Sequence, residues 1–187
     1  EKTRLNINDS YKSGHWKTEN VLKKISKKYK IKNLILRPGA VYGFPNKINN
    51  FNRLKLIPYS FPISLYLNNK ITLKSSGIQM RNFCSNKDIG IRVFNWIKNK
   101  NKTNILSNIS GDKTCSVKDF SYICIKIFKK IFKKKASVNI HFKSRKRKKL
   151  IVKKNIKIKN KDKVENFLKA FFLLLKKNKI IQQNLNR

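Results

Sequence analysis

The residues best suited to chemistry lie near the N-terminus, where Tyr11 and His15 are four positions apart. Apolar residues recur at three- and four-residue steps over residues 11–30 and predict a helix, on which positions i and i+4 share one face. A tyrosine phenol, with a pKa of about 10, acts as a base near neutrality only where positive charge stabilises the phenolate. The pair could therefore handle a proton, although a tyrosine at a helix start is also consistent with an ordinary surface residue.

A second candidate is Arg81, which follows the turn predicted at Ser75-Ser76-Gly77. Its planar guanidinium is suited to binding a diphosphate, and the simpler alternative is one more surface cation. The three cysteines have no metal-ligand spacing, so we expect a reducing compartment and no bound metal.

Helical and extended segments alternate along the chain, a pattern typical of α/β architecture. We expect helices over residues 11–30, 62–68, 88–98, 116–133 and 164–177, and strands over residues 33–36, 71–74, 81–84 and 104–109. Residues 44–59 lack a sustained period and predict a long loop. The side chains expected to face the core include Trp16, Val21, Leu22, Ile25, Tyr29, Ile89, Val93, Phe94, Trp96 and Ile97.

The chain has 187 residues with 47 Lys+Arg against 8 Asp+Glu, a net charge of +39, and its 40% hydrophobic content is sufficient for a core. No apolar run approaches the roughly 18 residues of a membrane-spanning helix, and a cytoplasmic location is expected. The chain begins with Glu1 and shows no signal segment, so we interpret its N-terminus as cut rather than targeted.

Residues 133–161 contain 14 Lys and Arg residues and no acidic one, most densely at residues 143–149. Blocks of like charge are commonly solvated connections, and we favour that interpretation. Adjacent cations also release counterions when they meet a phosphate backbone. The alternative function is therefore a basic, non-catalytic protein that binds nucleic acid or an anionic membrane surface through residues 143–149.

Four segments, in order, resemble one known family. Residues 11–19 (YKSGHWKTE) are similar to the active-site helix of the NAD-dependent epimerase/dehydratase family of the extended short-chain dehydrogenase/reductase superfamily, which has Tyr, three residues, Lys, and Glu four further on. Residues 36–43 (LRPGAVYG) resemble the strand and turn that follow, and residues 55–58 (KLIP) the substrate loop. Residues 77–83, followed by Asp88-Ile89 opening a helix, resemble the segment with the nucleotide-clamping arginine.

The resemblance covers most of residues 5–132 and implies the C-terminal part of a Rossmann-type, NAD(P)-binding α/β fold with a smaller α+β substrate-binding lobe. Residues 1–44 would form the end of the Rossmann domain. Residues 45–132 would form the substrate lobe, interleaved with the last Rossmann elements. Residues 133–161 would be a basic connection, and residues 162–187 a C-terminal helix and tail.

The implied function is that of a nucleotide-sugar epimerase or dehydratase, an isomerase or oxidoreductase of polysaccharide biosynthesis. NAD or NADP would take and return a hydride from a nucleoside-diphosphate sugar, and the enzyme could form a homodimer. By resemblance the catalytic residues are Tyr11 and His15. The cofactor-binding residues are Tyr11, His15, Arg37, Pro38 and Val41, and the substrate-binding residues are Ala40, Leu56, Ile57, Pro58 and Arg81.

The sequence departs from the family pattern in three ways. His15 stands in the lysine position, Ala40 stands where an asparagine often contacts substrate, and Gly-x-x-Gly-x-x-Gly, which receives the dinucleotide pyrophosphate, does not occur. A histidine is cationic only below a pKa of about 6.5 and reaches less far than lysine. An enzyme with altered chemistry and a folded, inactive homologue therefore both remain open.

Overall fold

The computed structural model describes residues 10–44, 53–100, 103–142 and 162–177. The chain divides into two compact units, the first formed by residues 1–37 and 92–107 and the second by residues 38–91 and 108–187. No helix in the described part of the chain combines the length and apolar character needed to cross a membrane.

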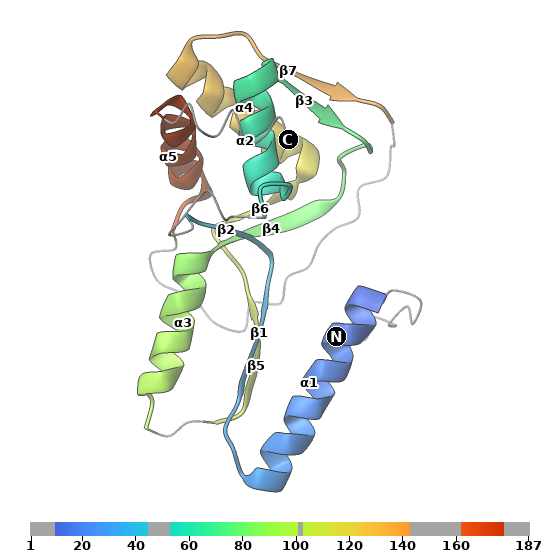
Figure 1. Ribbon diagram of the computed structural model, residues 1–187, viewed down its shortest axis with the longest axis vertical. Coiled ribbons are helices and arrows are strands. Elements are labelled where there is room, and N and C mark those ends of the chain that lie inside the picture. The colour runs from blue at the N-terminus through green and yellow to red at the C-terminus, as the bar shows by residue number, and fades with distance from the viewer. Residues whose placement is uncertain (1–9, 45–52, 101–102, 143–161, 178–187) are drawn as a thin grey trace. The chain divides into compact units, whose positions relative to one another are not determined.

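Unit 1 contains helix α1 (Ser10–Tyr29), most of strand β1 (Leu34–Pro38), the second half of helix α3 (Asn86–Lys98) and the start of strand β5 (Ile105–Ile109). β1 and β5 form a two-stranded sheet and lie side by side in Figure 1. Helix α1 ends where Lys30 adopts a left-handed conformation, with φ 54°.

The apolar side chains of unit 1 are largely exposed. Among the described residues of this unit, Ile35 is the one hydrophobic residue whose side chain is buried. Several side chains that were predicted to face the core are exposed instead: Trp16, Val21, Leu22, Ile25, Tyr29, Phe94 and Ile97. That part of the prediction is wrong because the helical period locates an apolar stripe but does not determine whether another element covers it.

The strands of unit 2 form two small sheets. β2 (Ala40–Tyr42) pairs in parallel with β4 (Met80–Ser85), and β4 pairs antiparallel with β6 (Lys113–Ser116). β3 (Lys70–Leu73) pairs in parallel with β7 (Ser137–Ile140). β7 was not predicted from the sequence, because Val138 and Ile140 alone, between lysine-rich flanks, give too short an alternation to detect.

Three helices enclose the core of unit 2: α2 (Ile57–Asn68), α4 (Val117–Phe132) and α5 (Val164–Lys177) (Figure 1). Aromatic rings fill this core, as where Phe83 of β4 stacks on Phe120 of α4 with ring centroids 4.0 Å apart. The predicted apolar face of α5 is confirmed, with these side chains all buried: Val164, Phe167, Leu168, Phe171, Phe172 and Leu175.

Two helix starts test the sequence analysis. Ser116 caps α4 as predicted, because its Oγ accepts a hydrogen bond from the Asp119 N–H at 3.0 Å. α2 begins at Ile57, earlier than the predicted residue 62, so the expected loop over residues 44–59 is too long at its C-terminal end. Pro62, the first residue of the predicted helix, lies inside α2, although proline removes an interior helical hydrogen bond.

Candidate functional site

The residues predicted to form the site fall into two groups, one in each unit. Tyr11, His15 and Arg37 belong to unit 1. Pro38, Ala40, Val41, Leu56, Ile57, Pro58 and Arg81 belong to unit 2. The basic segment at residues 143–149 lies outside the described residues.

Tyr11 and His15 occupy successive turns of α1 and are in contact. Their rings meet edge to face with centroids 4.5 Å apart, so the predicted shared helix face is confirmed. Tyr11 is 74% exposed, which leaves its hydroxyl open to a ligand. The pair therefore presents a phenol beside an imidazole, the two groups that a proton transfer at this position would use.

Arg37, near the end of β1, is held by a carboxylate that the sequence analysis did not pair with it. Its Nε donates to Glu19 Oε1 at 2.8 Å and its Nη2 donates to Glu19 Oε2 at 2.6 Å. This guanidinium lowers the pKa of Glu19 from its usual value. The motif places Glu19 four residues after His15, but this spacing does not indicate that Arg37 is the partner of Glu19.

The segment after β1 approaches β4 closely. A Cβ added to Gly39 would lie 2.2 Å from the Asn82 carbonyl oxygen, so only glycine fits there without a shift. In the β2–β4 register, Ala40 pairs with Phe83 and Val41 with Cys84. Both Ala40 and Val41 are half-buried, whereas Pro38 is exposed.

Residues 56–58 form the start of α2. Leu56 is the N-cap residue and is 44% exposed, and its carbonyl accepts hydrogen bonds from the N–H groups of Tyr59 and Ser60 at 2.9 and 2.8 Å. Ile57 is half-buried and Pro58 is buried. The positive end of the helix dipole lies here, an arrangement that favours an anion.

Arg81 lies on β4 with an exposed side chain, opposite Cys115 of β6. Its Nη1 donates to the neighbouring Met80 carbonyl at 3.1 Å. Arg81 comes two residues before Phe83, the partner of Ala40. The structure therefore brings Ala40, Val41 and Arg81 into one three-stranded sheet, on neighbouring strands.

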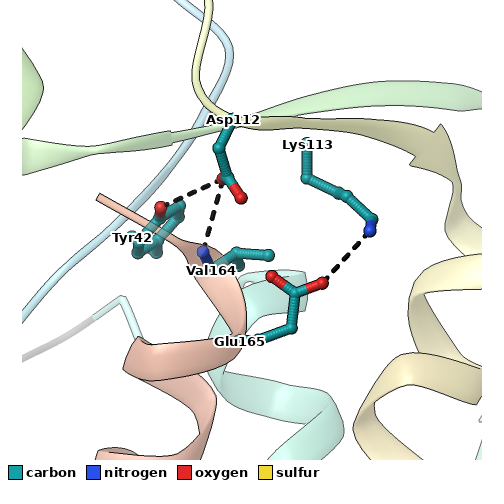
Figure 2. A network of polar contacts seen from close by, with 5 residues as sticks. All are labelled: Tyr42, Asp112, Lys113, Val164 and Glu165. Carbon is teal, nitrogen blue, oxygen red and sulfur yellow. Dashed lines mark hydrogen bonds and ion pairs between the residues drawn. The ribbon is translucent and has the colours of Figure 1, made fainter. Parts of the chain in front are cut away.

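A polar network that the sequence analysis missed joins β2 to the start of α5 (Figure 2). The Tyr42 hydroxyl donates to the Asp162 carbonyl at 2.6 Å and lies 3.4 Å from Asp112 Oδ1. The same Asp112 oxygen accepts the Val164 N–H at 3.3 Å, and Lys113 pairs with Glu165 at 3.1 Å. Burial raises the pKa of both Tyr42 and Asp112.

Within this network the Tyr42 hydroxyl has a structural role. Tyr42 is 0% exposed, so its hydroxyl cannot reach a ligand in solution. Its partners come from segments 70 and 120 residues away, a separation that gives no local sequence signal. Within the described ranges, no three His, Cys, Asp or Glu side chains are grouped to hold a metal ion.

No family model matches the sequence, and no curated protein matches it. Solved structures do match. UDP-N-acetylglucosamine 4-epimerase from Methanobrevibacter ruminantium, in complex with UDP-N-acetylmuramic acid, has a TM-score of 0.67 at 16% identity, over 92% of this chain and 58% of that chain. UDP-glucuronic acid 4-epimerase from Bacillus cereus, in complex with UDP-glucuronic acid and NAD, has a TM-score of 0.60 at 21% identity, over 89% and 52%.

A third match is TunA, an NAD-dependent NDP-hexosamine 5,6-dehydratase of tunicamycin biosynthesis, with a TM-score of 0.58 at 12% identity, over 85% of this chain and 52% of that chain. The fold is thus a mixed α/β fold with parallel strand pairs that matches the Rossmann-like fold of nucleotide-sugar epimerases and dehydratases. The chain spans between half and three fifths of the length of these structures.

Proposed function

We propose that this chain is part of an NAD(P)-dependent enzyme that epimerises or dehydrates a nucleoside-diphosphate sugar. The observation that carries the proposal is the structural similarity to two UDP-sugar 4-epimerases over 92% and 89% of the chain. The motif order found in the sequence supports it independently. In this proposal residues 1–44 end the dinucleotide-binding domain and residues 45–132 contribute most of the substrate lobe.

The residues of α1 fit the nicotinamide end of such a site. A phenol and an imidazole in contact, with the phenol exposed, provide hydrogen-bonding groups for a ribose and for a sugar hydroxyl. A bound nicotinamide dinucleotide supplies the hydride acceptor and donor. Tyr11 exchanges a proton with the sugar hydroxyl, and His15 lies beside the phenol in the place of the family's lysine.

The residues of unit 2 fit the nucleotide end. Arg81 offers an exposed guanidinium on β4, and Leu56 marks the positive end of α2. A diphosphate carries charge that both features favour. In this proposal Ala40, Leu56, Ile57, Pro58 and Arg81 line the substrate side, and Pro38 and Val41 lie toward the cofactor.

Calorimetric titration of the full chain with UDP-N-acetylglucosamine and with UDP-glucuronic acid tests this function. We expect saturable binding that Arg81→Ala weakens by about tenfold or more, because a charge-assisted bidentate contact is lost. Lys126→Ala is the matched control, since it removes one exposed charge from α4. Absence of saturable binding to both sugars, or equal affinity of Arg81→Ala and the parent, would contradict the proposal.

The gene supplies a second test. An in-frame strand, glycine-rich turn and helix encoded before Glu1 would support the proposal, and the extended protein could then be assayed directly. In that protein we expect Tyr11→Phe to lower kcat by about 10²–10⁴-fold, as for the loss of a general acid–base group. Tyr122→Phe, at an exposed position on α4, should leave kcat unchanged.

A further inference from the structure

A two-bond ion pair in the described part of unit 1 joins the helix that carries Tyr11 and His15 to strand β1. Arg37 of β1 binds Glu19 of α1 through two hydrogen bonds of 2.8 and 2.6 Å. The Glu19 side chain is 14% exposed and that of Arg37 is 37% exposed. Two parallel charge-assisted bonds fix the orientation of the partners as well as their separation.

Glu19 also lies on the functional face of the helix. It follows His15 by four residues and Tyr11 by eight, so the three side chains succeed one another along one face of α1. The hydrogen bond from Arg37 is the largest cause of the lowered pKa of Glu19, and the charge of His15 contributes as well. The carboxylate is therefore within electrostatic reach of His15.

Polar contacts join α1 to the rest of unit 1, and its apolar side chains are only partly covered. The apolar residues Val21, Leu22, Ile25 and Tyr29 of α1 are 40–60% exposed. At the C-terminal end of the helix, Ser26 Oγ and the Asn33 N–H both bond to Asn104 Oδ1, at 3.0 and 2.9 Å. At the level of the candidate site, the contact is that between Glu19 and Arg37.

We propose that Glu19 and Arg37 are a positioning pair that sets the position of α1 against β1 and thereby presents Tyr11 and His15 to a bound substrate. Arg37 then acts through Glu19 rather than by touching a cofactor. The catalytic consequence rests on the proposed function. The positioning of α1 does not rest on the proposed function, because it concerns only how α1 is held against β1.

Hydrogen exchange of the full chain, followed by mass spectrometry, tests the pair. The variants are Glu19→Gln, Arg37→Gln and the double reversal Glu19→Arg with Arg37→Glu. Lys113→Met is the control, because it breaks the ion pair with Glu165 in unit 2, whose side chains are 37% and 34% exposed.

We expect both single variants to speed exchange of the α1 amides by about three- to tenfold, since local opening becomes easier. The double reversal should restore the parent rate, and Lys113→Met should leave α1 unchanged. Parent-like exchange in both single variants would overturn the positioning role. A chain that binds no UDP-sugar but shows the expected exchange pattern would contradict the proposed function and leave the positioning pair standing.

Discussion

The Tyr42 hydroxyl donates a 2.6 Å hydrogen bond to the backbone carbonyl of Asp162, a residue 120 positions further along the chain. Tyr42 is fully buried on β2, and Asp162 lies two residues before the first residue of α5. Ser85 Oγ donates to the Asp162 carboxylate at 3.0 Å, so the same residue is also tied to the end of β4. The contact therefore fixes the start of the C-terminal helix to the sheet that carries Arg81.

Tyr42→Phe tests the contribution of this contact to stability. The substitution keeps the ring and leaves buried polar groups without their donor, which costs about 1–3 kcal/mol of unfolding free energy. Urea denaturation followed by circular dichroism measures the change. Tyr122→Phe, at a position 49% exposed on α4, is the control and should change stability by less than about 0.5 kcal/mol. Equal stabilities of the two variants would show that the buried bond contributes nothing.

Asp112 should make stability depend on pH. Burial raises its pKa above the ordinary value of 3.8. Its contribution to stability is therefore fully present below that value and is lost as the pH rises through the raised pKa. Asp112→Asn keeps an acceptor for the Val164 N–H but cannot ionise. We expect the asparagine variant to gain stability relative to the parent as the pH rises from 4 to 7.

Glu19, whose pKa is lowered rather than raised, provides the control. The pKa of Glu19 is lowered by its hydrogen bond from Arg37, so its contribution is present above the ordinary value of 4.5 and is lost as the pH falls. Glu19→Gln should therefore lose stability relative to the parent over the same rise in pH. Denaturation curves of both variants at several pH values measure the two slopes, and slopes of the same sign would contradict this assignment.

Helices α4 and α5 were predictable because their apolar residues recur at helical spacing and meet a core. Phe167 and Leu175 recur at helical spacing on α5 and are buried, so the period and the burial agree. β2 was missed because three residues are too short to show alternation, and β6 was missed because Cys115 is its one apolar residue. On α1 the period was correct, but its apolar face is exposed, since covering it depends on tertiary structure.

Of the candidate site, the contact between Tyr11 and His15 followed from helix geometry alone. The partner of Arg37 did not, because Glu19 lies 18 residues earlier on a different element. Two oppositely charged residues at that spacing meet only if the chain between them folds back. Local patterns therefore identified which residues share a helix face but not which elements are joined.

Replacing Gly111 or Gly90 with alanine should change the stability of the chain in opposite directions. A Cβ at Gly111 would lie 1.6 Å from the Phe83 carbonyl oxygen, whereas a Cβ at Gly90 would meet nothing within 4 Å. We expect Gly111→Ala to destabilise the chain by about 3 kcal/mol or more through overpacking against backbone. Gly90→Ala lies inside α3 and should stabilise it by about 0.5–1 kcal/mol. Thermal unfolding measures both changes. A Gly111→Ala variant as stable as the parent would contradict the close approach of Gly111 to β4.

The three cysteines should resist modification while the chain is folded. Cys84, Cys115 and Cys124 are all buried, and no disulfide joins them. Burial raises the pKa of the Cys115 thiol from 9.0 to about 11 and that of Cys124 well above its usual value. Because the thiolate is the reactive form, the raised pKa lowers the thiolate fraction at Cys115 by about a hundredfold.

Titration with a thiol-specific disulfide reagent at pH 8 measures this protection. In the folded chain we expect reaction at least about a hundredfold slower than in guanidinium chloride, where all three thiols become accessible. Gly90→Ala, which should stabilise α3, provides a folded control whose thiols stay protected, and Gly111→Ala should expose Cys84 on the neighbouring strand. Rapid reaction of all three thiols in the native parent would show that the core of unit 2 opens on the timescale of the assay.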